Sequence, residues 1–395
     1  MSERHVERIP KNPVLSCQSF GHDSVGGFPS VLDAGEVRYL NRGSLAIAFV
    51  LKQIGISRGD EVLIPAYHCM AMVEPVLWAG AKPVFFRISG NTGLDLEDAE
   101  RRLTSACKVL IAPHYFGFHQ DMPKIRAFCD RHHLVLIEDC AHAFLGSTAG
   151  HPLGYYGDYA IGSAWKFFPV DEGACVVSSR GNLSSVATEP RGIFSEIKSL
   201  MNTLEYAVEY RRLEWFNPVF RLAFRLKDGL WSMLKKKPSV ESIVHEEKRG
   251  GATGFDGSRV SLSISRSSRM IISASSKSRM AKNRRENYLK LLSRLGSLPG
   301  CRPLFSSLPD GVVPHVFPLV VENPEKVFHR LKDEGVPVIR FGEYLSEDME
   351  KGLCKVSEDY SRRVFQFPCH QDLKAKELEW MMDRIADIFL RHAQE

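Results

Sequence analysis

A lysine near the middle of the chain has neighbours that are unusual for a solvated side chain. Lys166 ends the string Ser163-Ala-Trp-Lys166, which follows an apolar segment at 159–163 and precedes Phe-Phe-Pro. A lysine that forms an imine must be held beside a site and partly desolvated, so that it spends time as a neutral amine. Ser163 could donate a hydrogen bond to a phosphate. The alternative is a surface lysine at a strand end, and the local string alone does not decide between the two.

An acidic residue follows another apolar segment. The string at 134–138 (LVLIE) runs directly into Asp139. Ligand groups lie at the carboxyl ends of the strands in open α/β sheets. A buried carboxylate there needs a cationic partner, and a protonated pyridine nitrogen is one such partner. Asp139 could instead cap the next helix. His142 could bond a ring oxygen of the same ligand, although a single histidine is more often structural.

A third candidate site precedes an apolar helical segment. In Asn41-Arg-Gly43-Ser44, the glycine allows close backbone approach, and the helix that follows offers amide donors to a phosphate. Gly-Ser before a helix is also common capping chemistry. The three sites occur in the order phosphate cradle, aspartate, lysine, which is the order in fold-type I enzymes that use pyridoxal 5'-phosphate (PLP).

The elements that must position these residues alternate along the chain. Apolar segments typical of strands lie at 61–65, 83–87, 109–113, 134–138, 159–163 and 175–178, and helical patterns at 44–54, 70–79, 94–103 and 124–132. Strands that are apolar throughout and separated by helices predict a mostly parallel sheet covered on both faces, in an α/β fold. A basic helical stretch at about 266–295 follows, then strands at 313–321 and 336–340 and helices at 325–334 and 375–393.

We therefore expect three parts. They are an N-terminal arm at 1–35, a large domain at 36–250 that binds the cofactor, and a small α+β domain at 251–395 with a linking helix. A length of 395 residues suits two domains rather than one core.

Composition narrows the function classes. The net charge of +5 is a mild excess that does not indicate nucleic acid and would suit small anions equally well. The nine cysteines form no CxxC pair and indicate reduced thiols, with no disulfide or zinc framework. The charged N-terminus is no signal peptide, and no apolar run reaches the about 18 residues of a membrane span. We expect a cytoplasmic protein without a metal.

The segment 185–250 breaks the alternation of strands and helices. Within it, 211–237 is rich in aromatic and basic residues, which would fit a helix lying on an anionic membrane. The favoured alternative is that this apolar surface is buried in a dimer interface or against the large domain.

Several strings together resemble the DegT/StrS family of PLP-dependent sugar aminotransferases. They are Gly59-Asp-Glu-Val-Leu-Ile-Pro65, Gly80-Ala-Lys-Pro-Val-Phe85, His114-Tyr-Phe-Gly117, Ile137-Glu-Asp-Cys-Ala-His-Ala143, Gly157-Asp158 and Phe367-Pro-Cys-His-Gln-Asp-Leu373. The resemblance covers most of the chain and is densest from 41 to 179.

The resemblance implies a role for each candidate residue. Lys166 would carry PLP as a Schiff base, Asp139 would pair with the pyridine nitrogen, and His142 would lie on the ring hydroxyl side. The phosphate would be met by Gly43, Ser44 and Ser163.

The resemblance also implies a reaction and partners. Family members are dimers with shared active sites, and they usually move an amino group from glutamate to a keto group of a nucleotide-linked sugar. We keep three alternatives open: a PLP-dependent sugar dehydratase, an aminotransferase for a non-sugar or lipid-linked acceptor, and a non-catalytic regulatory subunit. In the dehydratases a histidine usually replaces the lysine, so Lys166 argues against that alternative.

Three departures make this an atypical member. Ser163 and Lys166 are three residues apart instead of five, although Glu172 keeps the family's spacing of six after the lysine. Cys69 stands where an aromatic residue usually stacks on the cofactor ring, so we expect either that Tyr67 or His68 substitutes or that the stacking is weaker. The segment 185–250 replaces the family's usual middle segment.

Overall fold

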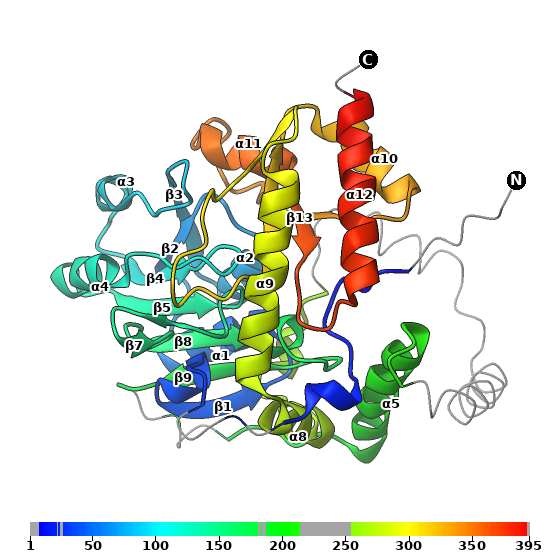
Figure 1. The fold of residues 1–395 in the computed structure, drawn as a ribbon. Helices are drawn as coiled ribbons and strands as arrows, with labels where there is room; N and C mark the ends of the chain where they lie inside the picture. Colours follow the sequence, from blue (N-terminus) through cyan, green and yellow to red (C-terminus); the bar gives the residue numbers. More distant parts are fainter. Residues whose placement is uncertain are drawn as a thin grey trace, which may run out of the picture.

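The computed structural model describes residues 8–21, 23, 27–180, 183, 187–213 and 254–392. Its centre is a seven-stranded sheet in the order β1-β9-β8-β5-β4-β2-β3 (Figure 1). The strands are β1 (Glu36–Leu40), β2 (Glu61–Pro65), β3 (Lys82–Phe86), β4 (Cys107–Pro113), β5 (Val135–Cys140), β8 (Tyr159–Ser163) and β9 (Ala174–Ser178).

The sheet is mostly parallel, as predicted. Strands β3, β2, β4, β5 and β8 run parallel, whereas β9 is antiparallel to both of its neighbours, β8 and β1. Alternate residues of β2 face opposite layers: Val62 and Ile64 belong to one apolar cluster and Leu63 to another. A strand buried on both faces has no polar side, which explains the uninterrupted apolar strings.

The helices of the large domain match the predicted ranges to within a few residues at each end. They are α1 (Gly43–Gln53), α2 (Met70–Trp78), α3 (Leu96–Arg101) and α4 (Met122–Arg131). Helices α1 and α2 pack on each other and on the face of Val62, while Met122 and Phe128 of α4 pack on the face of Leu63. The fold is thus a sheet between two helical layers.

A second sheet, in the order β10-β11-β13-β12, is antiparallel throughout. Its strands are β10 (Cys301–Pro303), β11 (Val316–Val321), β12 (Ile339–Arg340) and β13 (Val364–Pro368), and its helices are α10 (Pro324–Asp333), α11 (Lys355–Arg363) and α12 (Ala375–His392). This is the α+β arrangement expected of the C-terminal part. The domain limits given above stay predictions.

The basic stretch at 266–295 forms two helices where the sequence pattern suggested one. Helix α8 (Arg266–Ala274) ends at Ser275, and α9 (Lys277–Leu295) begins after Ser276, whose side chain accepts a hydrogen bond from the Arg279 amide. Two adjacent serines favour such a boundary, because their hydroxyls satisfy backbone groups at the helix ends. The long helix α9 runs between the two sheets and lies beside α12 (Figure 1).

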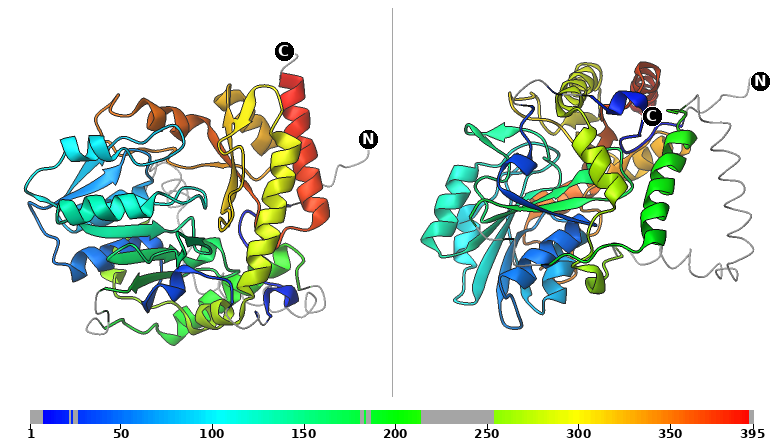
Figure 2. Two further views of the ribbon diagram at one scale, coloured as in Figure 1. Left: turned by 60° about the vertical axis from the view of Figure 1, so that its left-hand side comes forward. Right: turned by 90° about the horizontal axis from the view of Figure 1, so that it is seen from below.

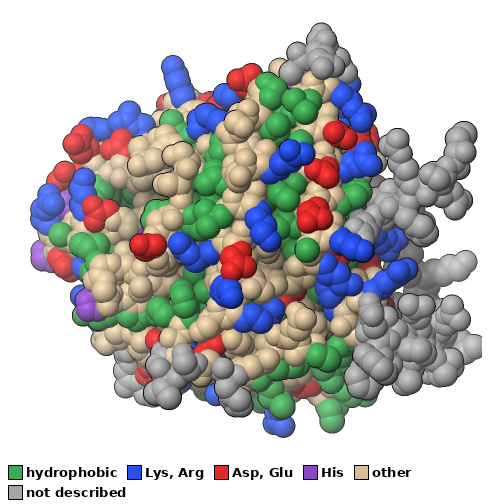
Figure 3. All heavy atoms as spheres, viewed as in Figure 1, with side chains coloured by type: hydrophobic (Ala, Val, Ile, Leu, Met, Phe, Trp, Pro, Cys, Tyr) green, Lys and Arg blue, Asp and Glu red, His purple; other side chains and the backbone are tan. Residues whose placement is uncertain are grey.

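The segment 185–250 is described only in part. Helix α5 (Ile193–Glu209) stands at the edge of the molecule, where it packs on α8 (Figure 2). The proposed interfacial helix at 211–237 lies almost wholly outside the described residues. Within the described part of the chain, no helix has the length and apolar character needed to cross a membrane. The face seen in Figure 3 mixes charges of both signs with apolar side chains.

One fully buried arginine joins the two parts of the fold. Arg284 of α9 has no exposed surface, and burial lowers its pKa to about 10. Its guanidinium donates to the backbone oxygens of Pro314, His315 and Lys166 and to the side-chain oxygen of Gln371, at 2.7–3.1 Å. It also covers the ring of Phe167 at 4.4 Å. Four acceptors in different directions suit the planar fork of arginine.

We expect Arg284→Lys to lower the free energy of unfolding by about 2–4 kcal/mol, because an ammonium cannot reach all four acceptors and buried carbonyls lose their donors. Urea unfolding followed by tryptophan fluorescence measures this. Arg294→Lys on the same helix is the control, since its ion pair with Asp383 is exposed and such pairs contribute little. Equal effects of the two substitutions would contradict the role given to Arg284.

Candidate active site

A cavity of about 500 Å³ opens at the carboxyl ends of the parallel strands. Pro113 and His114 reach it at the end of β4, Asp139 at the end of β5 and Ser163 at the end of β8. The strand order reverses direction around β2 and β4, and such a point is where open α/β sheets bind ligands. Six of the seven predicted site residues line this cavity: Gly43, Ser44, Asp139, His142, Ser163 and Lys166.

Lys166 ends a short 3-10 helix, η3 (Ala164–Lys166), that follows β8 directly. The turn is held by the Gly173 carbonyl, which accepts from the Ala164 amide at 2.8 Å. Gly173 has a φ of +145°, and a Cβ there would lie 2.7 Å from a side-chain carbon of Ile264, so only glycine fits. The backbone oxygen of Lys166 accepts from Arg284 at 2.9 Å. These contacts hold the backbone of Lys166, and none of them is made by its amine.

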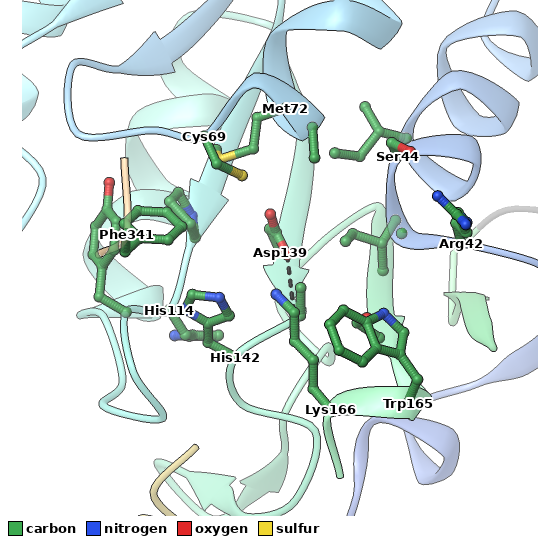
Figure 4. Close-up of a pocket in the computed structure, with 18 of the residues that line it drawn as sticks. Arg42, Ser44, Cys69, Met72, His114, Asp139, His142, Trp165, Lys166 and Phe341 are labelled. Carbon is green, nitrogen blue, oxygen red and sulfur yellow. Dashed lines mark hydrogen bonds between the residues drawn. The ribbon is translucent and has the colours of Figure 1, made fainter. Parts of the chain in front are cut away.

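The amine of Lys166 and the carboxyl of Asp139 point into the same space from η3 and β5 (Figure 4). Burial lowers the pKa of the Lys166 amine, although the charges of Cys69 and Asp139 oppose that shift. Burial likewise raises the pKa of the Asp139 carboxyl, against the Ala141 amide, which donates to it at 2.8 Å, and against Lys166. Burial therefore destabilises the charged form of both groups. A ligand that brings a cation to Asp139 would stabilise its carboxylate.

An anion cradle lies at the other end of the cavity. Helix α1 begins with Gly43 and Ser44, and no side chain caps its first turn. A Cβ on Gly43 would sit 3.9 Å from Cβ of Ser163, so the missing side chain leaves open the space between the two serines. Free amides at a helix start and two hydroxyls form a binding site for phosphate.

His142 is neutral in this setting. Burial and the nearby Lys166 and His315 hold the pKa of the His142 ring well below its ordinary value. Its Nδ1 accepts from the Phe116 amide at 3.4 Å, which places the ring proton on Nε2. The His142 ring can therefore donate one hydrogen bond without carrying charge.

Tyr67 does not line the cavity, in contrast to the role expected for it. Its side chain is fully buried and packs on Tyr115 and Phe341, with ring centroids 5.3 Å and 5.0 Å apart. Cys69 and Met72 take the place next to the cavity instead (Figure 4). The face that an aromatic side chain was expected to cover is lined by two sulfur-containing side chains.

The thiol of Cys69 should be unreactive although it lines the cavity. Burial raises the pKa of Cys69, and the thiolate is the reactive form. We expect iodoacetamide at pH 7.5 to label the exposed Cys17 much faster than Cys69, as measured by peptide mass spectrometry over time. Labelling of Cys69 at the rate of Cys17 would show that the cavity stabilises a thiolate, contrary to this account.

Several lining residues were not predicted from the sequence. Asn12 comes from the N-terminal arm, Phe341 from the C-terminal domain and Trp165 from the residue before the lysine. Glu172 also lines the cavity, where it pairs with Asn41 and Arg191. Only Trp165 and Glu172 had a local signal, since both lie close to Lys166 in the sequence.

A buried group at the wall of the cavity resembles a metal site in composition only. His114, Glu138 and Cys140 lie together and are fully buried. Nδ1 of His114 accepts from the Gln120 amide at 3.1 Å, so its proton is on Nε2, which donates to Glu138 at 3.0 Å. Glu138 also accepts three backbone amides, from 154, 156 and 157. The group is a hydrogen-bond network that fixes the loop after β5.

The fold and this cavity define a class: the chain has the fold of type I PLP enzymes. Solved structures agree over most of the chain. A DesV structure from S. venezuelae in complex with a ketimine intermediate gives a TM-score of 0.62 at 21% identity, covering 90% of this chain and 85% of that one. A putative sugar aminotransferase from Streptococcus pneumoniae in its PLP form gives 0.63 at 15% identity, covering 96% and 99%.

Within that class, residues 28–191 match the DegT/DnrJ/EryC1/StrS aminotransferase family, which confirms the resemblance for the segment that holds the cavity's lysine and aspartate. A GDP-perosamine synthase of Vibrio cholerae is 33% identical over 155 residues, which are 38% of this chain and 42% of the relative. A UDP-N-acetyl-3-dehydro-alpha-D-glucosamine 3-aminotransferase of Acidithiobacillus ferrooxidans is 34% identical over 161 residues, 40% and 42%. The chain spans about two fifths of the length of these curated relatives.

Proposed function

We propose that the chain is a PLP-dependent aminotransferase that moves an amino group to a keto group of a nucleotide-linked sugar. The observation that carries this proposal is the meeting of Lys166, Asp139 and the anion cradle of α1 in one cavity. The family match of 28–191 and the names of the curated relatives support the reaction and the class of acceptor.

The cavity's residues fit the cofactor group by group. The amides and hydroxyls of Gly43, Ser44 and Ser163 suit its phosphate, and the Asp139 carboxylate suits a protonated pyridine nitrogen. When bound, PLP supplies an electron sink for negative charge developing on the carbon beside the amino group. The neutral ring of His142 can donate to the hydroxyl of the cofactor ring.

The chain's own residues perform the proton movements. Burial lowers the pKa of Lys166, which favours the neutral amine that can take a proton from one carbon and return it to another. A cationic ring beside Asp139 would favour the ionised carboxylate, and that carboxylate would in turn keep the ring nitrogen protonated. Because Arg284 and Gly173 fix only the backbone around Lys166, the side chain can swing between the two positions.

We further propose glutamate as the amino donor, a homodimer as the working form and the cytoplasm as its location. A keto-sugar acceptor is favoured over a non-sugar one by the relatives named above. The presence of Lys166 disfavours the dehydratase reading. A purely regulatory subunit would not need the pair of Asp139 and Lys166 in one cavity.

The test is a pair of half-reactions on the purified protein loaded with PLP. Glutamate alone should convert the bound cofactor to its amino form with release of 2-oxoglutarate. Keto forms of UDP-, GDP- and dTDP-linked sugars should then regenerate the starting spectrum and yield an aminated sugar by mass spectrometry. If the protein takes up PLP but accepts an amino group from none of the donors tested, it is not an aminotransferase.

A further inference from the structure

Helix α5, at the edge of the molecule, turns polar side chains toward the protein (Figure 1). The buried residues of its first three turns are Ser199 and Thr203. The hydroxyl of Ser199 bonds to that of Ser265 at 3.0 Å, and the hydroxyl of Thr203 accepts from the Asp171 amide at 3.2 Å. A surface helix ordinarily packs an apolar stripe on the core. The inward face of α5 is held by hydrogen bonds instead, so its apolar residues lie on another face.

Those apolar residues form an exposed row, which we call the α5 stripe. It consists of Ile193, Phe194, Ile197 and Leu200, which are 40–87% exposed. Spacings of four and three residues place Ile193, Ile197 and Leu200 on one edge of the helix. Met270 of α8, the helix that packs on α5, is 69% exposed as well. Large apolar side chains gathered on a surface in this way mark a contact with a partner or a membrane.

Exposed cations adjoin the α5 stripe. Lys198 stands on α5 itself, and Ile193 lines a surface hollow together with Arg266 and Arg269 of α8. All three cations are exposed. Glu196 is the acidic residue in the first two turns of α5, and its carboxylate accepts from the Arg266 amide at 2.8 Å. Apolar side chains bordered by cations fit an anionic bilayer, where apolar groups reach the acyl chains and cations meet lipid phosphates.

The chain that leaves α5 has a similar composition. Residues 211–237 follow the helix almost directly and are rich in aromatic and basic residues. These residue types are typical of segments that lie on membrane surfaces. The sequence next to the α5 stripe therefore suits the same partner as the stripe itself.

A second copy of the chain fits this surface less well. A two-fold contact places the same patch of both copies face to face, so Lys198, Arg266 and Arg269 of one copy would approach those of the other. Like charges brought together in this way weaken a contact. The homodimer proposed above would then form through another face of the molecule.

We propose that the α5 stripe and its adjoining cations dock the protein on an anionic lipid bilayer. The apolar side chains enter the boundary between headgroups and acyl chains, while Lys198, Arg266 and Arg269 meet lipid phosphates. One short stripe gives reversible binding, because affinity scales with the apolar area that enters the bilayer. This contact does not depend on the proposed aminotransferase reaction.

Co-sedimentation of the full chain with lipid vesicles tests this surface. Vesicles of phosphatidylglycerol and phosphatidylcholine in equal parts should bind the wild type, and added salt or phosphatidylcholine alone should weaken binding several-fold. Phe194→Ser/Ile197→Ser should weaken binding to the anionic vesicles roughly 10- to 100-fold, because two apolar side chains no longer leave water. Lys198→Gln/Arg266→Gln should weaken it roughly 10-fold, the loss expected for two cations near an anionic surface.

The matched control removes two apolar side chains from other surfaces. Leu289 of α9 and Leu390 of α12 are each 48% exposed. Leu289→Ser/Leu390→Ser should therefore bind vesicles as the wild type does. Uptake of PLP, followed by the visible absorption, should be the same in every variant and shows that each one is folded.

The outcomes distinguish the partners that could cover the α5 stripe. Loss of vesicle binding in Phe194→Ser/Ile197→Ser, with full binding by the control, supports the membrane contact. A wild type that stays in solution beside anionic vesicles, or a stripe variant that binds as tightly as the wild type, overturns it. Dissociation of a wild-type oligomer by the stripe substitutions, seen by sedimentation velocity, would assign the surface to a second copy and overturns it too. A protein without aminotransferase activity that still binds through the stripe would remove the proposed function and keep the membrane contact.

Discussion

Lys166→Ala should abolish covalent cofactor binding and reduce turnover by roughly 10³-fold or more. Lys166 is the only lysine among the described residues that line the cavity, and it is also the group proposed to move the proton. Acid–base catalysis alone contributes about 10²- to 10⁴-fold. The visible absorption of the purified protein and the rate of 2-oxoglutarate release from glutamate measure the two losses.

The controls for Lys166 separate chemistry from folding. Lys108→Ala removes an exposed lysine of β4 and should leave both readouts unchanged. Added methylamine should partly restore turnover to Lys166→Ala, because a free amine can enter the space that the side chain leaves. A variant that keeps the visible band and more than about a tenth of the wild-type rate would place the chemistry on another residue.

Asp139→Ala should lower the turnover rate roughly 10²- to 10³-fold while some cofactor still binds. In the proposed mechanism the carboxylate would keep a cofactor nitrogen protonated, so its loss would weaken the electron sink that negative charge in the reaction requires. The anion cradle of Gly43, Ser44 and Ser163 is untouched and should still hold the phosphate. The rate of the glutamate half-reaction and the dissociation constant of PLP are the measurements.

A cofactor analogue gives the sharper form of this test. PLP methylated on the ring nitrogen carries a permanent positive charge, so it should raise the rate of Asp139→Ala above its rate with ordinary PLP. Asp139→Asn keeps the size of the side chain but lacks the charge, and we expect it to be nearly as slow. Without cofactor, Asp139→Asn should not lower the free energy of unfolding, because burial raises the pKa of Asp139 and its charge is a cost there. Full activity of Asp139→Asn would contradict the charge argument.

The sequence predicted the large sheet well because most of its strands can be recognised from residues that are adjacent in the sequence. Strands β2, β4 and β5 each have a run of apolar, buried residues, since helices cover both faces, and each is bounded by a helical pattern. Strand β1 was missed because it lies at the sheet edge and mixes charged with apolar residues. Helix α5 was missed as well, and several of its apolar side chains, such as Phe194, are exposed instead of packed on the core.

The sequence predicted those site residues that a short segment places at the end of a strand or at the start of a helix. Asp139 and Ser163 end apolar strands, and Gly43 precedes a helix, so their positions at one sheet edge follow from the topology. Phe341 and Asn12 could not be found in this way, because long-range packing brings them to the cavity from the C-terminal domain and the arm. Tyr67 was a plausible ring partner by spacing, but the strand end turns its side chain into the aromatic cluster behind the cavity.

The most direct test of the central claim is reduction of the PLP-loaded protein with borohydride, followed by digestion and peptide mass spectrometry. We expect one modified peptide, which holds Lys166 and carries the mass of a reduced pyridoxyl phosphate, together with loss of the visible absorption. Modification of a different lysine, or no modification of a protein that has been offered PLP in excess, would contradict it.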